Sequence, residues 1–188
     1  MHDEQIDFCK SVARKFPQRF TGVYVLDVGS LDINGNNKRY FSNSTYIGLD
    51  VAPGKNVDVV TPGHLYNAPD ETFDVIISTE CFEHDMYYKL TMKNIVRLLK
   101  SNGLFLFTCA APGRPEHGTK RSRPEDSPLT SVINEEWQNY FHNISEKELR
   151  EILDLDNIFS SYYIRENHDI LVAPLRLIHD LYFWGIKK

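Results

Sequence analysis

The sequence predicts an α/β fold built around a mostly parallel β-sheet, and three observations support this prediction. First, an apolar run that ends in Gly29 is followed by a second short run that ends in Asp50. Second, strand-length runs alternate with helical patterns up to Cys109, and this β-α-β rhythm requires parallel strands joined by right-handed crossovers. Third, the last apolar segment, residues 180–186, suits an antiparallel hairpin partner of the strand expected at 158–164.

Most of the expected strands are apolar without strict alternation, as is typical of strands that are buried on both faces of a sheet. These strands are residues 23–28, 45–49, 57–60, 73–78, 104–109, 158–164 and 180–186. Helical spacing and capping residues predict a helix over 3–14 on the sheet edge, a short helix near 38–42, a helix capped by Asp85 that runs to about Lys100, and a helix begun by Ser145 and Glu148. Residues 168–178 fit a strand or a helix, and Pro174 interrupts them.

Length and composition limit the class of protein. The 188 residues fit one domain, residues 1–188, and the 41% hydrophobic and 25% charged residues are ordinary for a soluble globule. No apolar run is long enough to span a membrane and the start lacks a signal-peptide profile, so a cytoplasmic protein is expected. The net charge of -5 argues against general nucleic-acid binding. Three cysteines without metal-like spacing predict neither disulfides nor a metal site.

Gly29 and Asp50 together indicate a nucleoside site. A ligand that crosses the carboxyl ends of strands needs a residue without a Cβ where it presses on the backbone, and an acid after the next strand can accept both ribose hydroxyls. Asp27 can accept from loop amides or from an amino group of the ligand. The alternative is that Gly29 only turns the chain and Asp50 only caps a loop. Leu31 and Asn34 stand where a nicotinamide-binding loop needs glycines, which disfavours a dinucleotide.

Four segments resemble the class I S-adenosylmethionine-dependent methyltransferases, in particular the small type 11 group. They are residues 25–30 (VLDVGS), 46–50 (YIGLD), 73–84 (FDVIISTECFEH) and 98–108 (LLKSNGLFLFT). The resemblance implies a Rossmann-like seven-stranded sheet with helices on both faces and an antiparallel C-terminal strand, which residues 180–187 fit. It also implies S-adenosylmethionine as the cofactor.

The resemblance assigns cofactor roles to nine residues. It implies that Asp27, Gly29 and Ser30 hold the methionine end, that Asp50 binds the ribose, that Val51 packs on adenine with Gly63 and His64 at its edge, and that Thr79 and Glu80 border the methyl group. The sequence departs from the family pattern at Leu31 and Ile33, which replace loop glycines, and at Pro62, which replaces an acid that commonly reaches the adenine amino group. We therefore expect unusual cofactor contacts at residues 32–35.

His84 is a candidate general base. Methyl transfer is an in-line displacement that depends mainly on positioning, and a base is needed only when the acceptor is a hydroxyl. His84 follows the fourth strand at the catalytic edge, where a neutral imidazole can take a proton. The alternative is a structural histidine that orients the loop together with Glu83.

Residues 110–128 predict a loop on the substrate side. The loop is rich in proline, glycine and charge, and its part from 114 to 123 holds Arg114, Lys120, Arg121 and Arg123 against Glu116 alone. We interpret it as a lid for an anionic or hydroxyl-rich acceptor, with Arg114 as a carboxylate or phosphate fork and His117 as a second base candidate. The alternative is a solvated charged loop.

Residues 137–143 (WQNYFHN) combine aromatic rings with hydrogen-bonding groups, which suits the wall of a substrate pocket. Tyr140 and His142 are the expected pocket members, and the alternative is that these rings belong to the core.

The sequence thus favours a methyltransferase that modifies an oxygen or nitrogen of a small molecule. A further resemblance, to methyltransferases that accompany glycan synthesis, suggests a saccharide or glycan precursor as the acceptor. The alternatives are a noncatalytic module that binds S-adenosylmethionine or a nucleoside, and, third, a nucleotide-dependent oxidoreductase. The oligomeric state stays open.

Overall fold

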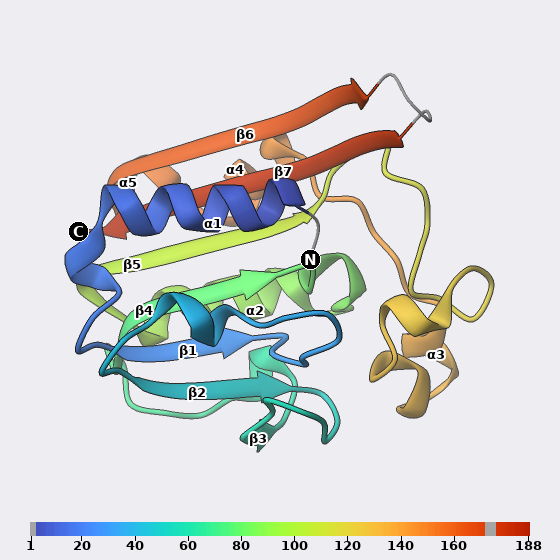
Figure 1. The fold of residues 1–188 in the computed structure, drawn as a ribbon, viewed down its shortest axis with the longest axis horizontal. Helices are drawn as coiled ribbons and strands as arrows, with labels where there is room; N and C mark the ends of the chain where they lie inside the picture. Colours follow the sequence, from blue (N-terminus) through green and yellow to red (C-terminus); the bar gives the residue numbers. More distant parts are fainter. Residues whose placement is uncertain (1–2, 172–175) are drawn as a thin grey trace.

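The computed structural model describes residues 3–171 and 176–188, and within these ranges the chain forms a seven-stranded sheet (Figure 1). The order across the sheet is β3-β2-β1-β4-β5-β7-β6. Six strands run parallel, and β7 runs antiparallel to its neighbours β5 and β6, as predicted. The strands are β1 (Tyr24–Val28), β2 (Thr45–Asp50), β3 (Val59–Val60), β4 (Phe73–Thr79), β5 (Leu99–Ala110), β6 (Phe159–Leu171) and β7 (Arg176–Lys187).

Helices cover both faces of the sheet. On one face α1 (Asp3–Lys15) packs Cys9 and Val12 against the central strands, near η1 (Pro17–Arg19) and η2 (Asn37–Tyr40). The other face carries α2 (Tyr88–Leu98), α4 (Glu146–Ile152) and α5 (Leu155–Ile158). Within the described ranges, no helix has both the length and the apolar composition needed to cross a bilayer.

The prediction that the first helix lies on the sheet edge is wrong. Its apolar stripe packs on inward side chains of three central strands, among them Val25, Val75 and Leu104, so α1 lies across a face (Figure 1). Periodicity identifies a helix that buries one side, but it does not say which part of the sheet that side covers.

Other boundaries also differ from the prediction. α2 begins at Tyr88, and Asp85 accepts from the Tyr87 amide and from the Thr91 hydroxyl without being the N-cap residue. β6 and β7 extend into the ambiguous segment, and the described parts of residues 168–178 are strand, while Pro174 lies outside the described residues. The Ser145 cap is confirmed, because its hydroxyl accepts from the Glu148 amide at the start of α4.

Beyond β5 the chain leaves the sheet and forms a covering segment, residues 111–144, which we call the lid (Figure 1). The lid holds η5 (Pro124–Asp126), η6 (Thr130–Val132) and α3 (Glu135–Gln138), so it is longer and more ordered than the predicted loop. Its end returns to the sheet through the amides of His142 and Ile144, which donate to the carbonyls of Glu83 and Ala110 at 2.9 Å each. The lid therefore stands over the carboxyl ends of the parallel strands.

Candidate active site

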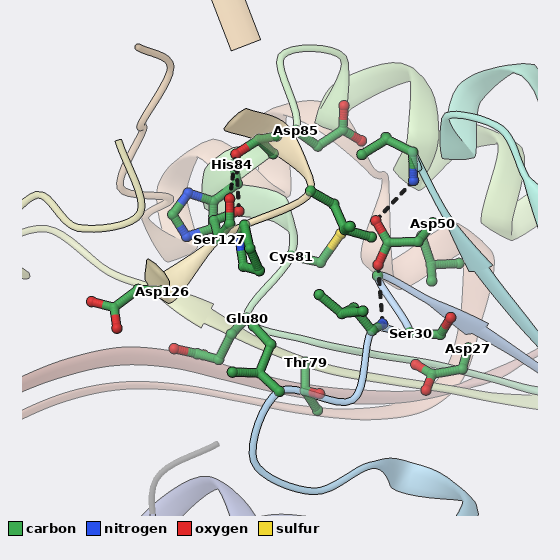
Figure 2. A pocket seen from close by; sticks show the side chains of 18 of the residues that line it. Asp27, Ser30, Asp50, Thr79, Glu80, Cys81, His84, Asp85, Asp126 and Ser127 are labelled. Carbon is green, nitrogen blue, oxygen red and sulfur yellow. Dashed lines mark hydrogen bonds between the residues drawn. The ribbon is translucent and has the colours of Figure 1, made fainter. Parts of the chain in front are cut away.

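A cavity of about 650 Å³ lies between the lid and the carboxyl ends of β1, β2 and β4. This volume is typical of pockets that bind small molecules. The strand order reverses between β1 and β4, and open α/β sheets bind their ligands at such a switch point. The lining is rich in acids, among them Asp27, Asp50, Glu80, Asp85 and Asp126 (Figure 2). It also contains Glu116, and its basic residues are Arg114 and Arg123.

Gly29 forms the floor of the cavity where β1 ends. Its φ is +79°, and a Cβ at this position would lie 2.5 Å from the Cys81 sulfur, so the site requires glycine. The amides of Gly29 and Ser30 both donate to the carbonyl of Leu49. The Ser30 hydroxyl donates to the Asn56 carbonyl at 3.0 Å, so its hydrogen is used within the protein.

The loop after Gly29, in which Leu31 and Ile33 replace the glycines of the family pattern, is held in shape by Asp32. The Asp32 carboxylate accepts from the Gly35 amide at 2.8 Å and from the Asn36 side chain at 3.0 Å, and it lies 2.8 Å from the Lys55 ammonium. These partners, Lys55 first, lower the pKa of Asp32 to about 2. The fixed loop places further residues in the cavity wall, namely Leu31, Ile33, Asn34, Gly35, Asn36 and Asn37.

Asp27 is the centre of a buried polar group beside Gly29. It accepts hydrogen bonds from the Tyr46 hydroxyl and from the Asn37 amide nitrogen, which also donates to Thr79 at 3.1 Å. Burial raises the pKa of Asp27 to about 7, although both hydrogen bonds oppose the rise. The Asn37 amide oxygen is buried and has no partner among the described residues. It is thus an acceptor beside the cavity that a ligand N–H can satisfy.

Asp50 ends β2 with its carboxylate held in place. One oxygen accepts from the Val51 amide at 2.8 Å and the other from the Leu31 amide at 3.0 Å (Figure 2). Burial raises the pKa of Asp50 above its usual range. Because each carboxylate oxygen has two lone pairs, both can still accept a hydrogen bond from a ligand.

Gly63 and Val51 line the same end of the cavity, whereas His64 is not among the lining residues. The His64 ring packs on Tyr87 instead, with ring centroids 4.2 Å apart. Asp85 does line the cavity, and it accepts from Thr91, the residue against which Gly63 packs. The structure therefore brings an acid to this end, although Pro62 occupies the position where the family pattern has one.

At the other end, Glu83, His84 and His117 form what we call the histidine cluster. One potential ligand atom from each lies within 4.8 Å of the other two. The His84 and His117 rings meet edge to face with centroids 5.0 Å apart, and Phe141 packs on both. Burial lowers the pKa of His84 to about 3 and also lowers that of His117, so both imidazoles are neutral at pH 7.

Arg114 lines the cavity as predicted, but its guanidinium is bound by carboxylates of the chain itself. It lies 2.5 Å from the fully buried Asp180 and 3.9 Å from Glu80. Burial raises the pKa of Asp180 to about 6 even though Arg114 opposes the rise. Arg121 is also paired with an acid of the chain, since it lies 3.0 Å from Glu116. Arg123 likewise pairs with Glu125 and Asp126, so three of the four basic side chains of residues 114–123 face acids of the chain itself.

Tyr140 and His142 are not among the lining residues. His142 lies 3.0 Å from Glu148 and stacks on Tyr88, which places it at the junction of the lid and α4. Trp137, from the same segment, does line the cavity and is buried. Sequence reasoning missed several other residues that line the cavity, namely Asn37, Cys81, Asp85, Ser127 and Leu129. Of these residues, only Asp85 had a local signal, which was its position before a helix.

Comparison with solved structures supports this fold. The methyltransferase of Burkholderia thailandensis that acts on 1,6-didemethyltoxoflavin, solved with that compound and S-adenosylhomocysteine, has a TM-score of 0.63 and 16% identity over 98% of this chain and 79% of that one. A phosphoethanolamine N-methyltransferase of Haemonchus contortus, solved with S-adenosylmethionine, has a TM-score of 0.64 and 14% identity over 96% of this chain and 52% of that one. At these identities the likeness concerns the fold.

A search of curated proteins found no match. A family model described as a methyltransferase domain matches residues 11–107, which is more than half of the 188 residues and includes β1 to β4 with Gly29 and Asp50. The chain therefore belongs to this methyltransferase-domain family, and it is a class I S-adenosylmethionine-dependent methyltransferase with a Rossmann-like fold.

Proposed function

We propose that this enzyme methylates a hydroxyl oxygen of a small, hydroxyl-rich molecule such as a saccharide or glycan precursor, with a nitrogen acceptor as the second candidate. The observation that carries the proposal is the pair of neutral imidazoles of His84 and His117 in the lining of an otherwise acidic cavity. Six lining carboxylates and the pairing of Arg114 with Asp180 disfavour an anionic acceptor.

The other end of the cavity fits the cofactor. Asp50 has lone pairs for two ribose hydroxyls, and Gly29 offers a surface without a Cβ. The unpartnered oxygen of Asn37, beside Asp27, suits the ammonium of the methionine end. Asp85, which lines the cavity, can accept from the adenine amino group. It would thereby take the role of the acid that Pro62 replaces in the family pattern.

Thr79 and Glu80 also line the cavity and would border the transferred methyl group. S-adenosylmethionine bound there would supply a sulfonium methyl group to the acceptor lone pair, and the electron pair of the broken sulfur–carbon bond would stay on sulfur. The proton of the acceptor hydroxyl needs a base, and a ring nitrogen of His117 can take it. Its Nδ1 lies 3.1 Å from the Pro115 carbonyl and carries the hydrogen, which leaves the Nε2 lone pair for the proton.

The experiment is transfer of a labelled methyl group from S-adenosylmethionine to a panel of saccharides, phenols, amines and phosphorylated compounds. We expect labelled product from hydroxyl-bearing neutral acceptors and a strong loss of rate in His117→Ala. Calorimetry on the same preparations should show cofactor binding that Asp50→Ala removes. Transfer confined to phosphorylated compounds would contradict the proposal. Cofactor binding without transfer to any acceptor would favour the noncatalytic module.

A further inference from the structure

We propose that the histidine cluster, Glu83, His84 and His117, is a binding site for a divalent transition-metal ion. The site lies at the acceptor end of the cavity. Its existence does not depend on the identity of the acceptor, but its effect on methyl transfer rests on the proposed function.

The donor set and its geometry fit such an ion. Two imidazole nitrogens and one carboxylate oxygen, each within 4.8 Å of the others, form the set. Ligands of one ion at about 2.0–2.2 Å lie about 3–4 Å apart, so small side-chain movements complete the site. Two histidines and one carboxylate are typical ligands of Zn²⁺, Fe²⁺, Co²⁺ or Mn²⁺ and leave coordination positions open.

Two polar atoms of these side chains are buried without a partner. These atoms are Glu83 Oε2 and His84 Nδ1, neither of which has a hydrogen-bond partner among the described residues. Glu83 is 0% exposed and His84 is 5% exposed. Buried polar atoms in native proteins are normally paired, and a cation shared between Glu83 and His84 would satisfy both of these atoms.

The surrounding contacts orient the ligands as they do in metal sites. Glu83 Oε1 accepts from the Ala110 amide at 3.2 Å, which leaves Oε2 as the free donor. The Nδ1 of His117 faces the Pro115 carbonyl at 3.1 Å, and metal-binding histidines commonly use one ring nitrogen in this way. Above the cluster, a Cβ on Gly118 would lie 2.5 Å from His84 Cε1, so the lid closes tightly over the site.

The charged neighbours are of both signs. Glu80 acts on Glu83 as a second negative charge, and Arg114 acts on it as a positive one. His84 and His117 line the cavity while Glu83 lies behind them, so a bound ion would face the acceptor. There it would bind the acceptor hydroxyl and lower its pKa, and the proton would leave to water because the imidazole lone pairs are then used as ligands.

The test uses the full chain, freed of metal by dialysis against a chelator and then titrated with Co²⁺. Binding is followed by calorimetry and by the visible absorption of Co²⁺. We expect one ion per chain, and we expect Glu83→Gln and His117→Ala each to weaken binding at least tenfold. His142→Ala is the matched control, because His142 lies in the same lid but pairs with Glu148, and it should bind Co²⁺ as the wild type does.

His117 lies on the lid, and circular dichroism would verify that the His117→Ala variant is folded. Absence of Co²⁺ binding by the wild type, or equal binding by His117→Ala, would overturn the metal site. Methyl transfer measured with and without chelator separates this result from the proposed function. Transfer that continues in chelator, together with no Co²⁺ binding, overturns the metal site and leaves His117 as the base. Co²⁺ binding that depends on His117, with no transfer to hydroxyls, supports the site and contradicts the proposed acceptor.

Discussion

Gly29 combines a positive φ with a close contact to Cys81, and each by itself favours glycine. Gly22 is a matched control, since its φ is +69° but no atom lies within 4 Å of a built Cβ. We expect Gly22→Ala to lower the free energy of unfolding by about 1 kcal/mol, the cost of the left-handed backbone. Gly29→Ala should lose about 3 kcal/mol, because overpacking is added.

Urea unfolding without cofactor measures both losses. Equal losses in the two variants would show that the contact with Cys81 relaxes at little cost.

Asp50 is held by two backbone amides and offers its remaining lone pairs to the ribose. Hydrogen bonds to a charged group contribute about 1.5–3 kcal/mol each. Asp50→Ala should therefore weaken cofactor binding about 100-fold or more, measured by calorimetry. Asp70, an exposed acid paired with Arg97, supplies the control, since Asp70→Ala should leave the affinity unchanged. Similar affinities in the two variants would mean that Asp50 does not bind the cofactor.

Asp27 makes the stability of the protein depend on pH. Its pKa rises from 3.8 in the unfolded chain to about 7 in the folded one. Between these values the folded state binds more protons, so the contribution of Asp27 to stability falls as pH rises. Relative to wild type, Asp27→Asn should gain stability from about pH 4 to about pH 7, by at most about 4 kcal/mol. Urea unfolding without cofactor at a series of pH values tests this, and parallel pH profiles would contradict it.

At the scale of elements, the lid is joined to the sheet by Arg114 and by Asp180 of β7. The Asp180 side chain is 0% exposed, so Arg114→Ala leaves a buried acid without its cation. We expect a loss of about 3 kcal/mol in the free energy of unfolding and weaker closure of the lid. Arg121→Ala is the control from the same element. Its pair with Glu116 is exposed, and its loss should stay within about 0.5 kcal/mol.

Urea unfolding measures both changes, and limited proteolysis reports the closure of the lid. A loss for Arg114→Ala no larger than that for Arg121→Ala would show that the ion pair does not join the lid to the sheet.

At the scale of the whole molecule, the cavity exists only when β1, β2, β4 and the lid are assembled. A ligand that binds only the folded state stabilises it by RT ln(1 + [L]/Kd), about 2.7 kcal/mol at 100 times Kd. S-adenosylmethionine should therefore raise the Tm of the wild type but not that of Asp50→Ala. A nicotinamide dinucleotide should leave the Tm unchanged, and a rise with that ligand would contradict the assigned cofactor.

The sequence by itself determined the succession of the strands along the chain, their mostly parallel direction and the positions of Gly29 and Asp50. These features depend on local patterns: apolar runs buried on both faces, a glycine after the first run and an acid after the second. The C-terminal strand β7 was predictable as antiparallel because its position directly after the preceding strand, at the C-terminus, suits a hairpin.

The tertiary structure alone decided which side chains meet. Arg114 pairs with Asp180, 66 residues away, so its charge is directed to the chain's own carboxylate. His117 meets Glu83 and His84 only because the lid folds back over η4 (Phe82–His84). The orientation of the buried Asn37 amide likewise depends on Asp27 and Thr79, to which its nitrogen donates. Such contacts are set by the packing of segments that are distant in the chain, and this packing leaves no periodic signal in the sequence. Buried strands and tight turns, in contrast, leave local signals, namely apolar runs and turn residues.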